Sequence, residues 1–267
     1  MASKQVTTIQ ETPLAAWKDA AGNDWEDDGT SDAQPIFPVI KIVQGTSTMD
    51  GAGRHGGDFW HSDSETFDST LNVVALLKRE TRAMFEADSD APVCMSADGV
   101  FSLPNMPLWD GRETVIAGGE ERFVPISVDT KVACEGCPFS RWQEDGTPPP
   151  CKQSSVLLVD RGEAGLAQLR VAGKSLKPLR QFIGRKCAPK KIPLYAYRLT
   201  LSTEEKNEPG KKWHQLVIAG ELMSPTVAKG YSDQLRAQRE RFDAGLKDAG
   251  AAATDDVVAA DDGWVDA

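Results

Sequence analysis

The chain has 267 residues and carries 40 acidic against 30 basic side chains, which gives a formal net charge of −10. At about 150 residues per domain, this length allows one large domain or two small ones with a buried core. No stretch approaches the roughly 18 apolar residues of a membrane span, and the first residues lack the apolar segment of a secretory signal. The sequence therefore predicts a soluble, cytoplasmic protein without a membrane partner. Its overall acidity argues against nucleic acid as a ligand.

The charge is unevenly distributed along the chain. Residues 1–70 carry a net charge of −8, residues 71–150 one of −6, residues 151–249 one of +9 and residues 250–267 one of −5. A basic third between acidic ends is typical of a polyanion-binding surface followed by an acidic tail. The alternative is a basic face that is merely solvated.

Acidic, polar sequence opens the chain, and β-branched sequence follows it. Residues 1–34 hold too little apolar surface to offset the entropy of ordering, which predicts a flexible acidic arm. The run at 35–44 predicts a first strand. Glycines at 50–58 predict a hairpin loop leading to residues 59–61, because the stretch matches neither phosphate-binding glycine pattern. Residues 71–85 fit a helix or a long strand, and the two valines near their start favour the strand.

Regular patterns return in the basic third of the chain. Buried strands are expected at 155–159 and 166–171. A short internal helix is expected at 175–183, with Ser175 as its N-cap and Gly184 at its end.

A hairpin and a second helix complete this part of the sequence. Strands are expected at 192–201 and 212–218, joined by a turn at 207–210. A C-terminal helix is expected at 224–249, where Ser224 precedes a proline at the first helical position. Short strands, hairpins and few helices predict a mainly β, α+β fold that forms a small antiparallel barrel or a sandwich.

The chain contains five cysteines, and an odd number in a cytosolic protein argues against a disulfide framework. Cys134-Glu-Gly-Cys137 has the spacing of a metal knuckle, and Cys94 and Cys151 could complete a tetrahedral site of four thiolates. Such a site would hold one structural Zn²⁺ per chain. It would also order the insertion at about 91–152, which has few periodic apolar runs.

Two other interpretations of the cysteines stay open: a redox-active CxxC pair and unliganded thiols. The sequence after the knuckle, Pro138-Phe-Ser-Arg, does not look like the helix that follows a redox motif. Cys187 is interpreted as a free thiol. A catalytic zinc would need His or carboxylate ligands and an open position. The histidines are instead expected on the surface or in packing: His55, His61 and His214.

The order of these residues resembles a family of phage- and plasmid-encoded proteins. The match rests on Cys94, the segment from Cys134 to Trp142, Pro150-Cys151-Lys152 and the Ser-Leu-Lys-Pro-Leu run at 175–179, and it covers about 35–220. The class that this family most resembles is phage single-stranded DNA-binding proteins built on an OB-like barrel with a zinc-held insertion. The resemblance implies an OB-like antiparallel barrel at 35–223, followed by the C-terminal helix, and a place in the host cytoplasm.

A protein of this class needs a cationic groove for phosphates and aromatic faces on which bases stack. Tyr195 and Tyr197 would share one face of a strand, where they could stack bases or pack under the helix at 175–183. Trp213 is expected to be exposed at a hairpin end, whereas Trp142 could contact bases or lie over the zinc sulfurs. The predicted DNA-binding residues are Arg141, Trp142, Lys152, Lys174, Lys177, Arg180, Arg185, Lys186, Lys190, Lys191, Tyr195, Tyr197, Lys211, Lys212 and Trp213.

The acidic end of the chain, residues 250–267, resembles the tips of bacterial and phage single-strand binders. That resemblance implies recruitment of replication or recombination proteins and competition with DNA for the basic surface. Tethered carboxylates have a high effective concentration near that surface. The alternative is a disordered end that only improves solubility. The predicted partner-binding residues are Asp255, Asp256, Asp261, Asp262, Trp264 and Asp266.

Together these features predict a sequence-tolerant single-stranded DNA-binding protein of phage or mobile-element replication or recombination. No enzymatic activity is predicted, because the sequence offers no P-loop, no paired-carboxylate motif and no nucleophile with an obvious base. A rival hypothesis is a zinc-containing protein-interaction factor that regulates RNA polymerase. A metal-dependent nuclease ranks last, since acidic residues are thinnest in the basic third.

Overall fold

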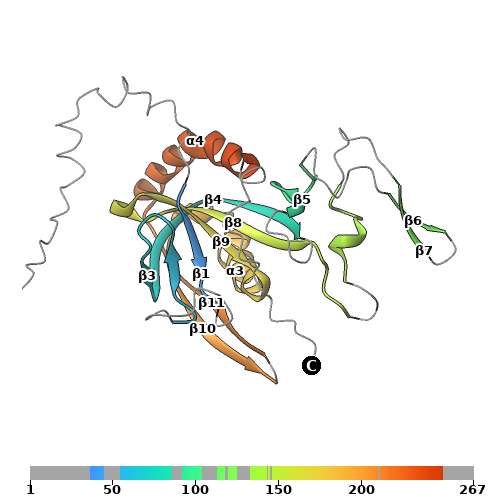
Figure 1. Cartoon of the computed structure of the whole chain (residues 1–267). Helices are drawn as coiled ribbons and strands as arrows, with labels where there is room; N and C mark the ends of the chain where they lie inside the picture. The colour runs from blue at the N-terminus through green and yellow to red at the C-terminus, as the bar shows by residue number, and fades with distance from the viewer. Residues whose placement is uncertain are drawn as a thin grey trace, which may run out of the picture. The chain divides into compact units, whose positions relative to one another are not determined.

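A strongly curled, mixed β-sheet dominates the structure, a computed structural model (Figure 1). It describes residues 37–44, 55–85, 92–103, 113–117, 120–124, 133–142, 144, 146–209 and 211–248. The predicted arm at 1–34 and the tail at 250–267, with all six of its partner-binding residues, lie outside the described residues. The strands of the sheet are β1 (Val39–Ile42), β2 (Phe59–His61), β3 (Phe67–Asp68), β4 (Thr70–Phe85), β5 (Pro92–Ser96), β8 (Lys152–Asp160), β9 (Leu166–Ala172), β10 (Tyr197–Glu208) and β11 (Lys211–Leu222).

The strands follow the order β11-β10-β4-β8-β9-β1-β2-β3, and β5 pairs with β4 outside this path. Two further strands, β6 (Glu113–Ala117) and β7 (Glu120–Val124), form a hairpin of their own. Most neighbours are antiparallel, but β1 runs parallel to β9. The prediction of an entirely antiparallel sheet is therefore wrong. β2 to β8 lie between β1 and β9 in the chain, and so long a connection allows the parallel pairing that a hairpin cannot make.

The long strand β4 organises the sheet. Its first residues pair with β10, most of its length pairs with β8, and its end pairs with β5. The register with β8 shifts between Ala75 and Leu77, and such a bulge bends the strand and increases its twist. One bent strand that serves three partners lets the sheet curl into a half-barrel (Figure 1). The prediction of a strand at 71–85 is confirmed.

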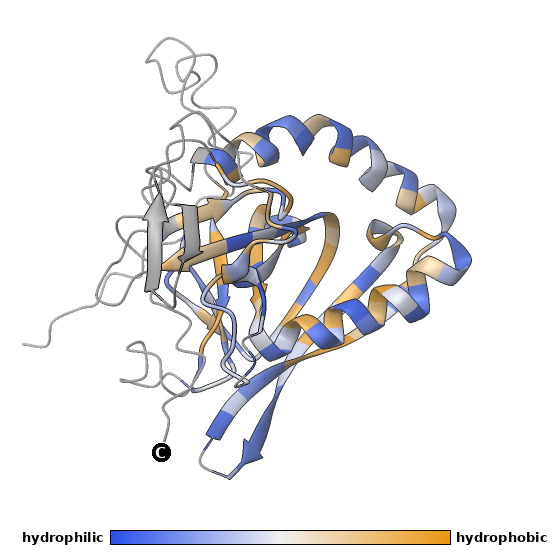
Figure 2. Ribbon diagram, turned by 90° about the vertical axis from the view of Figure 1, so that its right-hand side faces the viewer, coloured by the Kyte–Doolittle hydropathy of each residue, from blue (hydrophilic) through white to orange (hydrophobic). Residues whose placement is uncertain are grey.

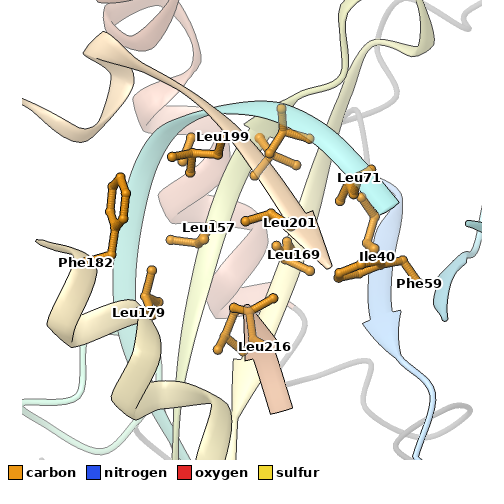
Figure 3. Close-up of a cluster of buried hydrophobic side chains, with 14 of the residues drawn as sticks. Ile40, Phe59, Leu71, Leu157, Leu169, Leu179, Phe182, Leu199, Leu201 and Leu216 are labelled. Carbon is orange, nitrogen blue, oxygen red and sulfur yellow. The ribbon is translucent and has the colours of Figure 1, made fainter. Parts of the chain in front are cut away.

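Alternating side chains place an apolar cluster on each face of the sheet. On the inner face, Leu157 and Leu199 are buried together with Phe182 of the helix α3 (Leu176–Phe182), as Figure 3 shows. On the outer face, Leu158 is buried beneath Phe242 of the helix α4 (Pro225–Asp248). Each fully buried side chain of this size contributes about 1.5–3 kcal/mol. The two clusters therefore fix both helices against the sheet.

The short internal helix is present as α3, but both of its ends differ from the prediction. Ser175 does not cap the helix. Its buried hydroxyl accepts a hydrogen bond of 3.0 Å from the backbone N–H of Leu216 on β11. The side chain thus satisfies a buried N–H that has no strand on that side. At the other end, the backbone continues past Gly184 in a π-helical turn, Ile183–Cys187, and a 3-10 turn, Ala188–Lys190.

The C-terminal helix is present as α4. Ser224 accepts a hydrogen bond of 3.5 Å from the backbone N–H of Val227, in the position of an N-cap. Arg79 of β4 donates two hydrogen bonds to Asp243, at 2.8 and 2.9 Å, which ties the helix to the outer face of the sheet. Neither this helix nor any other in the described part of the chain is long and apolar enough to cross a membrane.

Candidate nucleic-acid interface

A groove of about 450 Å³ opens between the β10–β11 hairpin and the turn that precedes α3. Its lining combines positive charge, one aromatic ring, two amides and a single carboxylate. The lining residues are Lys174, Lys177, Lys206, Asn207, Glu208, Trp213 and Gln215. Two predicted features of a polyanion site therefore meet in one place, cations from two elements and a flat aromatic ring, and neutral hydrogen-bonding groups lie beside them.

The hairpin flanks the groove because its tip extends beyond the sheet. β10 pairs with β4 only up to Ser202, but it pairs with β11 as far as Glu208. In that register Lys206 lies directly opposite Trp213, so both side chains project from the same face of the hairpin. Polar residues dominate this tip, which is coloured hydrophilic in Figure 2. The apolar ring of Trp213 is thus an exception among its neighbours.

Lys174 joins the two sides of the groove. Its Nζ lies 3.3 Å from the centroid of the Trp213 ring and 3.1 Å from a carboxylate oxygen of Glu208. Its backbone carbonyl accepts a hydrogen bond of 3.1 Å from Gln215. Trp213 is consequently half-buried rather than exposed, which corrects the prediction. The indole Nε1 is buried and has no hydrogen-bond partner.

Exposed cations continue from the groove along α3 and the turns after it. Arg180 lies one helical turn after Lys177, and its guanidinium is 3.7 Å from the carboxylate of Glu80 on β4. Lys212 at the hairpin tip pairs with Glu205 at 2.7 Å. Four further predicted cations are exposed on the turns after α3: Arg185, Lys186, Lys190 and Lys191. Lys211 lies at the hairpin tip and is partly exposed.

The exposed cations from the groove along α3 are here called the cationic path. At its end on the inner face of the sheet lies a carboxylate, Glu80, beside Arg180. Lys78 forms an ion pair with Glu80, and Gln153 donates a hydrogen bond of 3.2 Å to it. Burial opposes ionisation of Glu80, but the hydrogen bond and charge of Lys78, helped by Arg180, outweigh burial and hold its pKa below the usual range. Glu80 is therefore ionised and neutralises part of the positive charge around it.

The two tyrosines do not form a base-stacking platform. The strand expected from residue 192 starts at Tyr197, because residues 194–196 form a 3-10 turn. Tyr197 is buried in the inner cluster, stacks edge-on against Phe182 and donates a hydrogen bond of 3.0 Å to the carbonyl of Lys186. Tyr195 instead packs against the outer cluster. The alternative that a tyrosine packs under the helix is correct for Tyr197.

The four cysteines of the predicted metal site line one small cavity of about 10 Å³. Cys94 lies on β5 opposite Met84, and Cys151 directly precedes β8. Cys134 and Cys137 face the same cavity from a tight turn whose ends are joined by a backbone hydrogen bond of 3.4 Å. The elements thus bring together thiols that are far apart in the sequence.

A partly buried arginine, Arg82, stands beside these thiols. Burial and the three neighbouring cysteines raise the pKa of Cys151 to about 12, while the charge of Arg82 opposes that rise. Burial also raises the pKa of Cys137. The Nε of Arg82 is buried and has no hydrogen-bond partner. Among the described residues, no group of three or more His, Cys, Asp or Glu side chains is arranged as a ready metal site.

The other residues singled out from the sequence lie around these two features. Trp142 follows the 3-10 turn at Pro138–Ser140 and is 61% exposed, so it does not cover the thiols as a buried lid would. Arg141 is also exposed, and Lys152 begins β8 beside Cys151.

Cys187 and the three histidines do not line the cavity of the four other cysteines. Cys187 is a free thiol buried in the inner cluster, away from the four other cysteines in the packing, and burial raises its pKa. His61 is buried and pairs with Asp68 at 3.0 Å, while His55 is exposed. His214 packs beneath the glycine turn at residues 56–57.

Some residues of the site were missed from the sequence. Lys206 and Gln215 line the groove, but neither stands out in a basic stretch. The pattern of the hairpin could have identified them. Gln215 lies two residues after Trp213 and so shares its face of the strand, and Lys206 lies opposite Trp213 on the partner strand. Arg82 gave no signal at all, since only the register of β4 against β8 brings it near the cysteines.

Comparison with known proteins adds no relative to this description. No protein-family model matches the sequence, no curated protein matches it, and no solved structure matches the fold. The resemblance drawn from the order of the cysteines therefore stays a prediction.

Proposed function

We propose that the chain is a sequence-tolerant single-stranded DNA-binding protein that acts in the replication or recombination of a phage or mobile element. The observation that carries this proposal is the groove in which Lys174 lies over Trp213, with Lys177 and Lys206 beside them. Binding, and not catalysis, is the proposed activity.

The chemistry of the groove suits single strands better than duplexes. Lysines attract phosphates without regard to sequence, and an indole face accepts any base. Stacking on an aromatic ring contributes about 1–3 kcal/mol per base. Duplex DNA keeps its bases stacked inside, so it could use the lysines but not the ring. Asn207 and Gln215 add neutral donors and acceptors at the same site.

The connectivity of the sheet supports an OB-like barrel as the finer description of the fold. β4, β8 and β9 form a meander, α3 follows, and the β10–β11 hairpin returns to pair with β4. If these five strands are counted in chain order, the first strand, β4, pairs with both the second, β8, and the fourth, β10. An OB fold has this strand pairing, and its loops bind oligonucleotides. In this proposal the cysteine insertion occupies the first loop and the groove lies beside the last hairpin.

A structural Zn²⁺ at the four cysteines is the second part of the proposal. Four cysteines line this cavity of about 10 Å³, and thiolate is a ligand type that zinc commonly takes in structural sites. The unpartnered Nε of Arg82 also fits, because thiolates held by zinc are strong acceptors whereas neutral thiols are weak ones. Cys94, Cys134, Cys137 and Cys151 would hold the ion after their side chains adjust. The ion would supply cross-linking and no chemistry.

The decisive experiment measures binding of labelled oligo-dT and of a duplex of equal length over a series of salt concentrations. Preference for the single strand, with affinity that falls steeply as salt rises, is expected. Lys177→Ala should weaken binding, while Lys229→Ala, an exposed lysine on α4, serves as the matched control. Equal binding of duplex, or no binding at low salt, contradicts the proposal. Cleavage of the strand with Mg²⁺ would point to the nuclease instead.

The acidic tail is proposed to recruit replication or recombination proteins and to compete with DNA for the basic surface. Truncation after Ala253 removes all five carboxylates of residues 250–267. Affinity for oligo-dT should then rise, most clearly at low salt, because competing charges on a tether are lost. An unchanged affinity at every salt concentration would leave the tail with a solubilising role only.

A further inference from the structure

Cationic and aromatic side chains form a row on the outer face of the sheet, away from the groove. Ile40 and Leu169 are paired and point into the inner cluster, so the next residues, Lys41 and Arg170, point to the opposite face. Lys41 in turn lies opposite Trp60 on β2. Adjacent strands are about 4.8 Å apart, so the three side chains span about 10 Å. Arg170, Lys41 and Trp60 are here called the outer-face row.

The row lies next to α4 but outside the cluster that the helix covers. On β8, Val156 is the residue opposite Arg170, and it is buried in the outer cluster. The last turns of α4 reach β9 at Gln168, where the position of a Cβ on Gly245 is 3.9 Å from the amide. None of the three row residues belongs to that cluster, and each keeps part of its surface exposed.

The surroundings of Arg170 favour an added anion. Burial lowers the pKa of Arg170, and its hydrogen bond to the hydroxyl of Ser154 is long, at 3.5 Å. No carboxylate among the described residues pairs with Arg170, in contrast to Arg79, which has Asp243. A desolvated guanidinium without an anion is unfavourable. A phosphate at this place would therefore be bound more strongly than at a solvated lysine.

The row also repeats the pairing seen in the groove. The Nζ of Lys41 lies 5.4 Å from the centroid of the Trp60 ring, as Lys174 lies over Trp213. The two places are close along the chain, because Lys174 follows Arg170 by four residues, at most about 13 Å of extended backbone. Lys152 on β8 shares the outer face, since it alternates with Ser154, which lies opposite Ala172. Cationic side chains thus lie near the end of β9 both at the groove and on the outer face.

We infer that the outer-face row is a second contact site for the same nucleic-acid strand, with phosphates at Arg170 and Lys41 and a base on Trp60. This inference rests on the proposed function of the groove. A strand that fills the groove passes the end of β9 and continues across the outer face. An acidic peptide could bind Arg170 and Lys41, but it would not stack on the ring of Trp60.

The test compares a short and a long oligo-dT, of about 6 and about 16 nucleotides, which lie near the two ends of the range of site sizes of single OB folds. Lys41→Gln and Trp60→Leu should each weaken binding of the long oligomer about 5-fold or more and leave the short one unchanged. Lys41→Gln should also reduce the salt slope for the long oligomer by about one. Lys229→Gln on α4 is the matched control for loss of a lysine.

The variants also separate the failure of this inference from failure of the proposed function. Lys177→Ala in the groove should weaken both lengths. If wild-type protein binds neither length, the proposed function fails; if both lengths bind and the row variants change neither, only the row is wrong. A synthetic peptide of residues 250–267 that binds wild type but not Lys41→Gln, without any effect of that variant on DNA, would also overturn the inference. Thermal unfolding of Lys41→Gln, which lies outside both cores, checks that the fold is intact.

Discussion

The groove and the cysteine cluster lie toward opposite ends of β4 and are held in place by different means. The hairpin tip beside the groove is formed by the ends of β10 and β11. The residues of these strands that face the inner cluster are buried in it: Leu199, Leu201 and Leu216. The cysteine cluster has little apolar support: Met84 and Cys151 are buried, with Cys94 and Phe139 packed against them. The groove should therefore persist whenever the sheet folds, whereas the cysteine region should depend on its ligand.

The largest expected effect follows from removing the metal. Cys137→Ser should abolish stoichiometric zinc, because three thiolates no longer close a tetrahedral site, and structural zinc contributes on the order of 10 kcal/mol to the folding of small metal-held units. Protease cleavage within residues 92–151 should follow, while the main thermal transition of the sheet changes little. Zinc content and limited proteolysis measure both. Cys187→Ser is the control and should keep one zinc per chain; equal loss of zinc in the two variants refutes the assignment.

A core substitution should produce the opposite pattern. Leu199 is fully buried in the inner cluster between β4 and β11, so Leu199→Ala should cost about 2–5 kcal/mol of unfolding free energy. Urea unfolding measures this loss. The groove and the sheet should unfold in one transition because they share this cluster. If DNA binding and the sheet are lost at different urea concentrations, the groove does not depend on the core as argued.

Removing the ring of the groove should have an intermediate effect. Trp213→Leu keeps apolar bulk beside Lys174 but removes the stacking face, so affinity for oligo-dT should fall by about 1–3 kcal/mol with little change in the salt slope. Trp142→Leu, near the cysteines, tests the other predicted DNA-binding tryptophan in the same assay. An equal loss in both variants would mean that bases stack at both ends of β4, and no loss in Trp213→Leu would remove the ring from the site.

The smallest effect concerns acid stability at the inner-face end of the cationic path. The folded-state pKa of Glu80 is held below its unfolded value, so this group contributes stability above about pH 4.3 that is lost as pH falls through the folded pKa. Glu80→Gln should lower unfolding free energy at pH 7 by less than about 1 kcal/mol and make no difference well below pH 4. Urea unfolding at both pH values measures this. A larger gap in acid than at neutral pH would reverse the assigned sign.

Much of the fold follows from local patterns that the sequence displays. The strand at 71–85, the hairpin of β10 and β11 and the helix from Pro225 all rest on periodicity, turn residues and capping, which act over a few neighbours. The convergence of four cysteines was also inferred from spacing, and their shared cavity agrees with it. The prediction that all strands are antiparallel was wrong for β1, which runs parallel to β9. Pairing between strands that are distant in the sequence leaves no local pattern.

The candidate site was less accessible to such reasoning. Trp213 was expected to be exposed because the sequence shows its lysine neighbours at 211 and 212. It does not show Lys174, which lies over one face of the ring from another element. The sequence allowed Tyr197 to stack on bases at the surface or to pack in the core. Its edge-on contact with Phe182 in the structure shows that it packs in the core. Serine is a residue type that often caps a helix, but the hydroxyl of Ser175 instead accepts a hydrogen bond from the backbone N–H of Leu216 on β11.

The sequence by itself determined where charge, cysteines and alternating apolar residues lie along the chain, because each of these is a property of composition or short-range order. Only the tertiary structure decided which of them meet. It placed Lys174 on Trp213, Arg82 beside the thiols and Arg170 in line with Lys41 and Trp60. These meetings depend on strand register and on the curl of β4, since both arise from contacts between segments far apart in the chain.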